Sequence, residues 1–180
     1  MTKQEVAAAI IEAFRKVKPP PHWCVVARGE GPEPALVEKI FIGKLWNELS
    51  DNDLDRYPAL LLFSAESFLY FLPAYLLREL DGHHFKNNDL TLLLTLGMTD
   101  EQRDKLVNPR RYGALTEWDN AIYRFSTLTK PQAKAIADFL AHKIEKPRKR
   151  EPLEYPLIRE ALRNFWLPRS NMQVRASPDV

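Results

Sequence analysis

The apolar stretch from Tyr57 to Leu77 constrains the fold more than any other feature of this sequence. From Phe68 to Leu80, apolar residues would surround a helix on almost every side, and such a helix belongs in the centre of a fold. Ser64 predicts the helix start, because its hydroxyl can accept hydrogen bonds from the free amides of the first turn. Pro73 lies inside this predicted helix and removes one backbone hydrogen bond, which predicts a kink or a split.

The same stretch has about the length that a membrane span needs. It contains Glu66, however, and a carboxylate in a bilayer costs on the order of a few kcal/mol. We therefore interpret it as a buried helix of a soluble protein and expect no membrane partner. The first residues lack the basic leader and long apolar run of a secretory signal, which favours a cytoplasmic location.

Composition supports a helical fold. The 180 residues include 14 prolines but 6 glycines, a balance that favours helices with sharp ends over a sheet with many glycine turns. The length suits one domain. We expect a mainly α protein, a single compact domain of about six helices, with at most a minor β element near residues 23–27. Apart from the central helix, helices are predicted near 6–17, from after Pro34 to Leu49, near 129–144 and near 156–166, and a further helix is predicted to begin at Thr99.

The chain is expected to divide into four parts. A helical core domain at 1–145 is followed by a proline-flanked basic linker at 146–152. A C-terminal helix at 153–168 is expected to pack on or near the core, and 169–180 to form a disordered tail.

Two hydroxyl–glutamine pairs predict further helix starts. Thr99 with Gln102, and Thr129 with Gln132, both match the capping box, in which each side chain satisfies the backbone amide of the other residue. The polar run at 50–53 is expected to break the chain between helices.

Asp51, Asp53 and Asp55 resemble the start of a calcium loop. The loop then requires Gly at its sixth position and Glu at its twelfth, where this chain has Arg56 and Leu62. We interpret the segment as a polar turn.

No other motif indicates a metal, a cofactor or a catalytic residue, and none is assigned. The lone cysteine, Cys24, excludes a disulfide framework and a multi-cysteine zinc site. The adjacent His83 and His84 are poorly placed to share one metal and are expected on a surface turn. The sequence has no phosphate-binding glycine loop, dinucleotide fingerprint or serine elbow. We therefore lean against an enzyme. An enzyme would need a site assembled from scattered residues, for which the candidates are Glu66, Tyr75, His83 and His84.

Basic residues gather toward the C-terminus. Residues 143–180 hold 9 basic and 5 acidic side chains, whereas the whole chain has a net charge of +2. Arg148, Lys149 and Arg150 are the candidate phosphate contacts of an alternative function, in which the protein associates with nucleic acid. Phe165 and Trp166 share an apolar stripe with Ile158 and are expected to be core residues, not base-stacking ones.

Two stretches resemble a bacterial domain family of unknown function. The first is Phe-Leu-Tyr-Phe-Leu-Pro-Ala-Tyr-Leu at 68–76, which fits the family's F-x-Y-x-L-P-A-Y-L signature. The second is Phe-Ser-Thr-Leu-Thr-Lys-Pro-Gln at 125–132, which resembles its F-x-x-L-T-x-x-Q segment. The resemblance covers about residues 36–142. It implies a helical fold and no established activity.

The best-supported function is that of a small cytoplasmic, non-catalytic protein-binding module of the immunity or regulatory type. This hypothesis rests on a compact domain without a chemical motif. If the helix around Pro73 shapes a groove for the partner protein, its polar contacts would come from Glu66, Tyr70 and Tyr75; if not, these residues only pack in the core.

Overall fold

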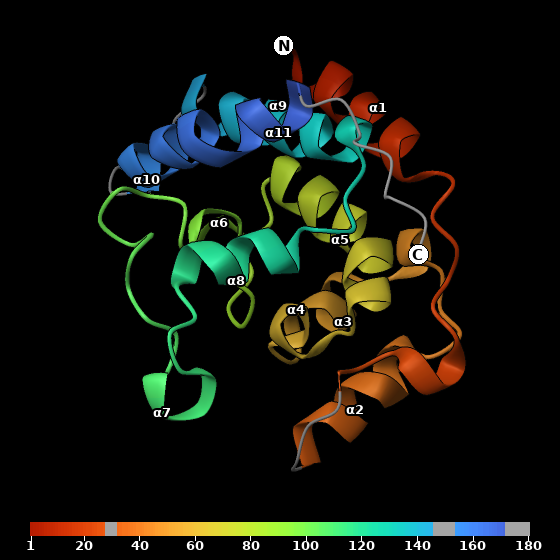
Figure 1. Ribbon diagram of the computed structural model, residues 1–180. Helices are drawn as coiled ribbons and strands as arrows, with labels where there is room; N and C mark the ends of the chain where they lie inside the picture. The colour runs from red at the N-terminus through yellow and green to blue at the C-terminus, as the bar shows by residue number, and fades with distance from the viewer. Residues whose placement is uncertain (28–31, 146–153, 172–180) are drawn as a thin grey trace, which may run out of the picture. The chain divides into compact units, whose positions relative to one another are not determined.

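A computed structural model describes residues 1–27, 32–145 and 154–171, and every structural statement below concerns these residues. They are mainly helical and contain no strand, only two isolated β-bridges, which confirms the predicted fold class (Figure 1). The predicted linker at 146–152 and the end of the predicted tail, 172–180, lie outside the described residues. The chain forms two compact units: an N-terminal unit, Lys3–Leu93, and a C-terminal unit, Met1–Thr2 with Leu94–Val180.

The N-terminal unit is built around one long helix. Its elements are α1 (Lys3–Phe14), η1 (His22–Cys24), α2 (Pro32–Phe41), η2 (Trp46–Glu48), α3 (Asp51–Asp55), α4 (Ala59–Leu62), α5 (Ala65–Leu80) and the first residues of α6 (Leu90–Thr95). Helix α5 is buried over most of its surface, and α1 packs against it. The Ser64 hydroxyl accepts a hydrogen bond from the Ser67 amide at 3.1 Å, so the predicted start of α5 is confirmed.

Helix α5 continues through Pro73 without a split. A proline inside a helix costs about 3 kcal/mol. The buried side chains around it, among them Phe71, Leu72 and Leu76, offset this cost through tertiary packing.

Two predictions near residue 50 need correction. The helix expected to run to Leu49 ends at Phe41, because Gly43 adopts a left-handed conformation with φ 71°. The polar run at 50–53 begins a helix where a break was expected. Ser50 and Asp53 form a reciprocal capping box: the Ser50 hydroxyl accepts from the Asp53 amide at 3.2 Å, and the Asp53 carboxylate accepts from the Ser50 amide at 3.0 Å.

Near residues 23–27, where the sequence predicts at most a minor β element, the structure has the 3-10 turn η1 and one isolated bridge instead of a strand. Val26 forms an antiparallel bridge with Phe63. The Ala27 amide donates to the Leu62 carbonyl at 2.8 Å, and the Ser64 amide donates to the Val25 carbonyl at 3.3 Å. These bonds tie the segment before α2 to the N-terminus of α5.

The C-terminal unit is built around α9. Its elements are the last residues of α6, then α7 (Pro109–Tyr112), α8 (Glu117–Arg124), α9 (Lys130–Glu145), α10 (Glu154–Ala161), a π-helical turn η3 (Leu162–Trp166) and α11 (Leu167–Asn171). The predicted start of α9 is confirmed, since the Gln132 side chain accepts from the Thr129 amide at 2.9 Å. Helices α10 and α11 pack against α9. The helical segment that begins with α10 ends at Asn171, so it includes residues 169–171 of the predicted tail.

The helix predicted after Thr99 is absent. The Gln102 amide does bond to the Thr99 hydroxyl at 3.3 Å, but the residues that follow form turns. Their backbone groups pair elsewhere: the Arg103 carbonyl accepts from the Trp118 amide at 3.2 Å, and the Lys105 carbonyl from the Glu117 amide at 2.8 Å. Pairing with a distant segment replaces the local helical bonds.

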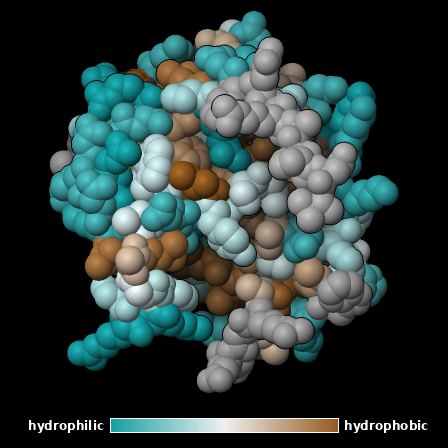
Figure 2. Space-filling view, in the orientation of Figure 1, coloured by the Kyte–Doolittle hydropathy of each residue, from teal (hydrophilic) through white to brown (hydrophobic). Residues whose placement is uncertain are grey.

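Apolar side chains reach the surface at scattered positions (Figure 2). Leu61, on α4, is 71% exposed. Single exposed apolar residues are ordinary in folded proteins, so exposure alone marks no site. In the part of the chain that the structure describes, no helix is long and apolar enough to cross a membrane.

Candidate functional site

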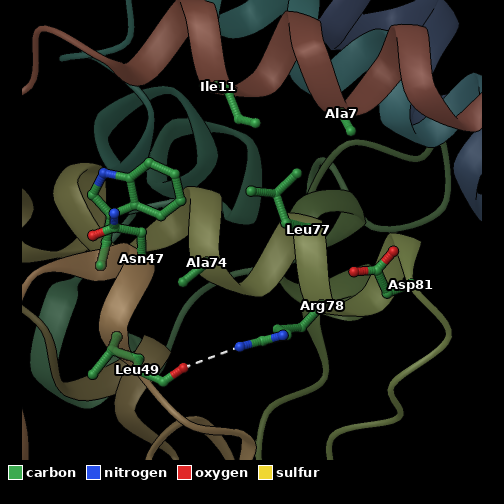
Figure 3. Close-up of a pocket in the computed structure, with 9 residues that line it drawn as sticks. Ala7, Ile11, Asn47, Leu49, Ala74, Leu77, Arg78 and Asp81 are labelled. Atoms are coloured by element: carbon green, nitrogen blue, oxygen red, sulfur yellow. Dashed lines mark hydrogen bonds between the residues drawn. The ribbon is translucent and has the colours of Figure 1, made fainter.

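A pocket of about 540 Å³ lies within the N-terminal unit, between α1, α5 and the segment around η2 (Figure 3). We call it the α1–α5 groove. Its lining residues are Ala7, Ile11, Trp46, Asn47, Leu49, Ala74, Leu77, Arg78 and Asp81. Ala7 and Ile11 are one turn apart on α1, and Ala74, Leu77 and Arg78 follow the same helical spacing on α5. Small side chains on both helices leave the space that the pocket occupies.

Polar contacts from α5 hold the η2 side of the groove. The Trp46 backbone hydrogen-bonds the Tyr70 hydroxyl. The Arg78 guanidinium donates to the Leu49 carbonyl at 3.3 Å (Figure 3). Burial raises the pKa of Tyr70, so this phenol is neutral at physiological pH. The loop that carries Trp46 is therefore anchored at two points on α5.

The charged residues of the groove are paired with neighbours. The Arg78 Nε lies 3.1 Å from the Asp51 Oδ1, and the Lys3 Nζ lies 2.7 Å from the Asp81 Oδ1. Ile11 is 47% exposed and lines the groove. An apolar group entering the groove would thus cover apolar surface without removing the partner of a charged side chain.

The four predicted groove residues are not among those that line it. Tyr70, Pro73 and Tyr75 are buried within the unit. Glu66 is exposed at the N-terminus of α5, where its carboxylate accepts from the Cys24 thiol at 3.4 Å. A backbone amide and this thiol lower the pKa of Glu66. Ala7 on α1 and Ala74 on α5 are the small residues that line the groove instead, and no sequence pattern singled them out.

The residues of the scattered-enzyme hypothesis come together only in part. The Tyr75 and His83 rings both contact Phe85, with centroid separations of 5.1 and 4.7 Å. Glu66 precedes Tyr75 by nine helical residues, a rise of about 14 Å at 1.5 Å per residue. His84 is exposed on the turn after α5. Glu66 therefore lies apart from the other candidates.

Tyr75 is completely buried, and its hydroxyl has no hydrogen-bond partner among the described residues. Burial raises the pKa of this phenol far above its ordinary value. The group cannot act as a base at neutral pH.

The aspartates that resemble a calcium loop engage three different partners. Asp51 contacts Arg78, Asp53 caps α3, and Asp55 accepts from the Lys86 amide at 2.5 Å and the Asn87 amide at 3.0 Å. Within the described ranges, no group of three or more His, Cys, Asp or Glu side chains is arranged to hold a metal.

The candidate phosphate contacts Arg148, Lys149 and Arg150 lie outside the described residues. Phe165 and Trp166 are buried. Their rings pack against each other at 5.1 Å, and that of Trp166 against Phe125 at 4.9 Å. Their interpretation as core residues is confirmed.

Comparison with known proteins confirms the predicted membership of a family of unknown function. Neither the curated proteins nor the solved structures contain a significant match to this chain. A family model does match, and it spans residues 2–170, well beyond the 36–142 region of the resemblance. The chain thus belongs to the family described as "Family of unknown function (DUF6714)".

Proposed function

We propose that this protein is a non-catalytic protein-binding module of the cytoplasm, and that the α1–α5 groove receives an apolar side chain of its partner protein. The observation that carries the proposal is the lining of the groove. Ile11, Trp46, Leu49 and Leu77 give it an apolar wall, and its charged residues already have partners.

The energetics support an apolar occupant. Burying apolar surface contributes about 25 cal/mol per Å². A charged or strongly polar occupant would have to compete with the ion pairs of Arg78 and Asp81 for hydrogen bonds. A leucine or aromatic side chain faces no such competition, and side chains of this kind often provide the central contact of a protein interface.

Affinity capture from a lysate of the source organism tests the proposal with three variants of the full chain. Ile11→Asp places a charge in the groove, and Ala7→Trp fills it without a charge. Leu36→Asp is the matched control, because Leu36 is 40% exposed on α2 and does not line the groove. Capture is carried out with nuclease and at high salt.

We expect one stoichiometric protein partner to be retained by the wild type and by Leu36→Asp. Both groove variants should lose it, with affinity falling at least about tenfold, because a buried unpaired charge or a filled pocket costs more than about 1.4 kcal/mol. Retention of the partner by both groove variants would overturn the proposal. Capture of nucleic acid alone, lost with nuclease or at high salt, would favour the alternative function instead.

A further inference from the structure

A closed loop projects from the C-terminal unit between the turns after Thr99 and helix α8. Leu106 and Thr116 form an antiparallel bridge at its base. The Val107 amide donates to the Leu115 carbonyl at 2.9 Å, and the Glu117 amide to the Lys105 carbonyl at 2.8 Å. We call residues 106–115 the basic loop. Figure 1 shows its tip, the short helix α7, standing clear of α8 in the same unit.

The chain turns at both ends of α7 through residues with a positive φ angle. Asn108 and Gly113 have left-handed φ angles of 38° and 64°. Asn and Gly are the residues that tolerate this region best. Between them, the Tyr112 amide donates to the Asn108 carbonyl at 3.0 Å, and the Gly113 amide to the Pro109 carbonyl at 3.0 Å.

The base of the loop is also fixed against the preceding turn. The Gly97 backbone, at φ 81°, lies so close to the Glu117 carbonyl that a Cβ on residue 97 would overlap it. The Gly97 amide donates to the Gln102 side chain at 3.1 Å. These hydrogen bonds favour the folded conformation of the loop before a partner binds, which reduces the entropy cost of binding.

The tip of the basic loop presents two exposed arginines. Arg110 and Arg111 are exposed, the basic loop contains no acidic residue, and neither arginine forms an ion pair within the described ranges. Other cations of the unit do: Lys105 lies 2.8 Å from Glu101, and Arg163 lies 2.8 Å from Asp100.

Apolar surface accompanies the two arginines. Tyr112 and Leu106 are each 48% exposed, and Pro109 is exposed beside them in sequence. The Arg111 guanidinium lies 5.3 Å from the centroid of the Tyr112 ring. A guanidinium that stacks on a ring through its face keeps its N–H edge available for a carboxylate.

We propose that the basic loop is a binding surface for an acidic protein segment in which carboxylates flank an apolar side chain. Two arginines can each form a bidentate bond with a carboxylate, and Tyr and Arg are the residues that most often dominate protein interfaces. Exposed Leu106 and Pro109 favour a protein over a nucleic acid, because they can pack on an apolar side chain of a protein segment, whereas most contacts to a nucleic acid are hydrogen bonds to its phosphates and sugars. The basic loop belongs to the C-terminal unit, whereas the α1–α5 groove belongs to the N-terminal unit.

Fluorescence anisotropy with the full chain tests the proposal. The probe is a labelled 12-residue peptide of four Glu-Glu-Leu repeats. Peptides of the same length with Gln-Gln-Leu or Lys-Lys-Leu repeats are the matched probes. A 12-nucleotide uridine RNA tests nucleic acid as the alternative class of partner. The variant is Arg110→Glu with Arg111→Glu. Its control is Lys130→Glu with Arg159→Glu, which makes the same charge change at two other exposed residues of the unit. Circular dichroism checks that both variants fold.

We expect the wild type and the control to bind the acidic peptide within about twofold of each other, and the Gln peptide much more weakly. The loop variant should lose at least about tenfold in affinity and should gain affinity for the Lys peptide, because close charge pairs set partner choice. Ile11→Asp should bind the acidic peptide normally, so that failure of the groove proposal is distinguishable from failure of this one. Absence of acidic-peptide binding by the wild type, equal binding by the loop variant, or tighter binding of the RNA would overturn the proposal.

Discussion

The two units differ in whether the polar atom of a buried aromatic side chain has a hydrogen-bond partner. In the C-terminal unit, Trp166 is fully buried and its indole N–H donates to the Leu94 carbonyl at 2.8 Å. In the N-terminal unit, Tyr75 is equally buried, but its hydroxyl has no partner among the described residues. A buried polar group without a hydrogen bond costs about 1–3 kcal/mol. Equal burial therefore does not mean equal contribution to stability, and each unit can be tested on this point.

The largest effect is expected at Trp166. Trp166→Ala removes a ring packed against Phe125 and Phe165 and leaves the Leu94 carbonyl without its donor. We expect a loss of about 3–5 kcal/mol in the free energy of unfolding, measured by urea denaturation followed by circular dichroism. Trp46→Ala is the control, because Trp46 is only partly buried. An equal loss in both variants would contradict the central position of Trp166.

The helix caps of the two units offer a second comparison. The Ser64 hydroxyl both accepts from the Ser67 amide and donates to the Cys24 carbonyl, whereas the Thr116 hydroxyl caps α8 at a less buried position. We expect Ser64→Ala to cost about 1–2 kcal/mol and Thr116→Ala about 0.5–1 kcal/mol. Thermal and urea unfolding measure both, and the reverse order would show that burial does not decide the strength of these caps.

Tyr75→Phe should stabilise the protein by about 1 kcal/mol, because it removes an unpartnered buried hydroxyl and keeps the ring against Phe85. The urea midpoint should rise with an unchanged slope. Tyr155→Phe serves as a control at a half-buried tyrosine of the other unit. A lower midpoint for Tyr75→Phe would mean that the hydroxyl has a stabilising partner after all.

The smallest effect is expected at Asp53 and Asp119, the aspartates of the capping boxes at the starts of α3 and α8. Burial acts to raise the pKa of Asp53, but hydrogen bonds from Lys44 and Ser50 outweigh it and lower the pKa below its ordinary value of 3.8. Hydrogen bonds from the Thr116 side chain and backbone lower the pKa of Asp119 in the same way. A lowered folded-state pKa means that each carboxylate stabilises the fold above its unfolded pKa and loses this effect as the pH falls through the folded value.

Both Asp53→Asn and Asp119→Asn should therefore reduce the fall in melting temperature between pH 6 and pH 3. The reduction should be greater for Asp53→Asn, because the Lys44 Nζ lies 2.9 Å from the Asp53 Oδ1 and is an ionic partner in addition to the cap. Differential scanning calorimetry across this range measures it. If the melting temperatures of both variants fall with pH as steeply as that of the wild type, these two carboxylates do not have lowered pKa values in the folded state.

Local signals account for the part of the fold that the sequence predicts. Helices α5 and α9 carry both a cap and an apolar pattern within their own residues, so no distant contact is needed to identify them. The turns after Thr99 depart from prediction because Arg103 and Lys105 bond to the backbone near Glu117, a pairing that the local capping pattern does not reveal. The π-helical turn at Leu162–Trp166 likewise leaves no local signal.

The lining of the α1–α5 groove could not be predicted from the sequence, which leaves open whether the helix that contains Pro73 shapes a groove or only packs in the core. The sequence places a possible groove on the helix that contains Pro73, and the structure has a groove along that helix. Its lining depends on which face of α5 meets α1 and η2. A helix that is apolar on nearly every side does not reveal that orientation, because each face is equally suited to burial.

Gly97 has a consequence for the history of this chain as well as for its fold. Every other amino acid carries a Cβ, and a Cβ at residue 97 would overlap the Glu117 carbonyl. As long as the basic loop is useful to the organism, selection must remove every replacement at this position. A descendant that carries another residue there has either lost the loop or rerouted the chain around it, so the identity of this single residue in related genes reports whether the loop has been inherited.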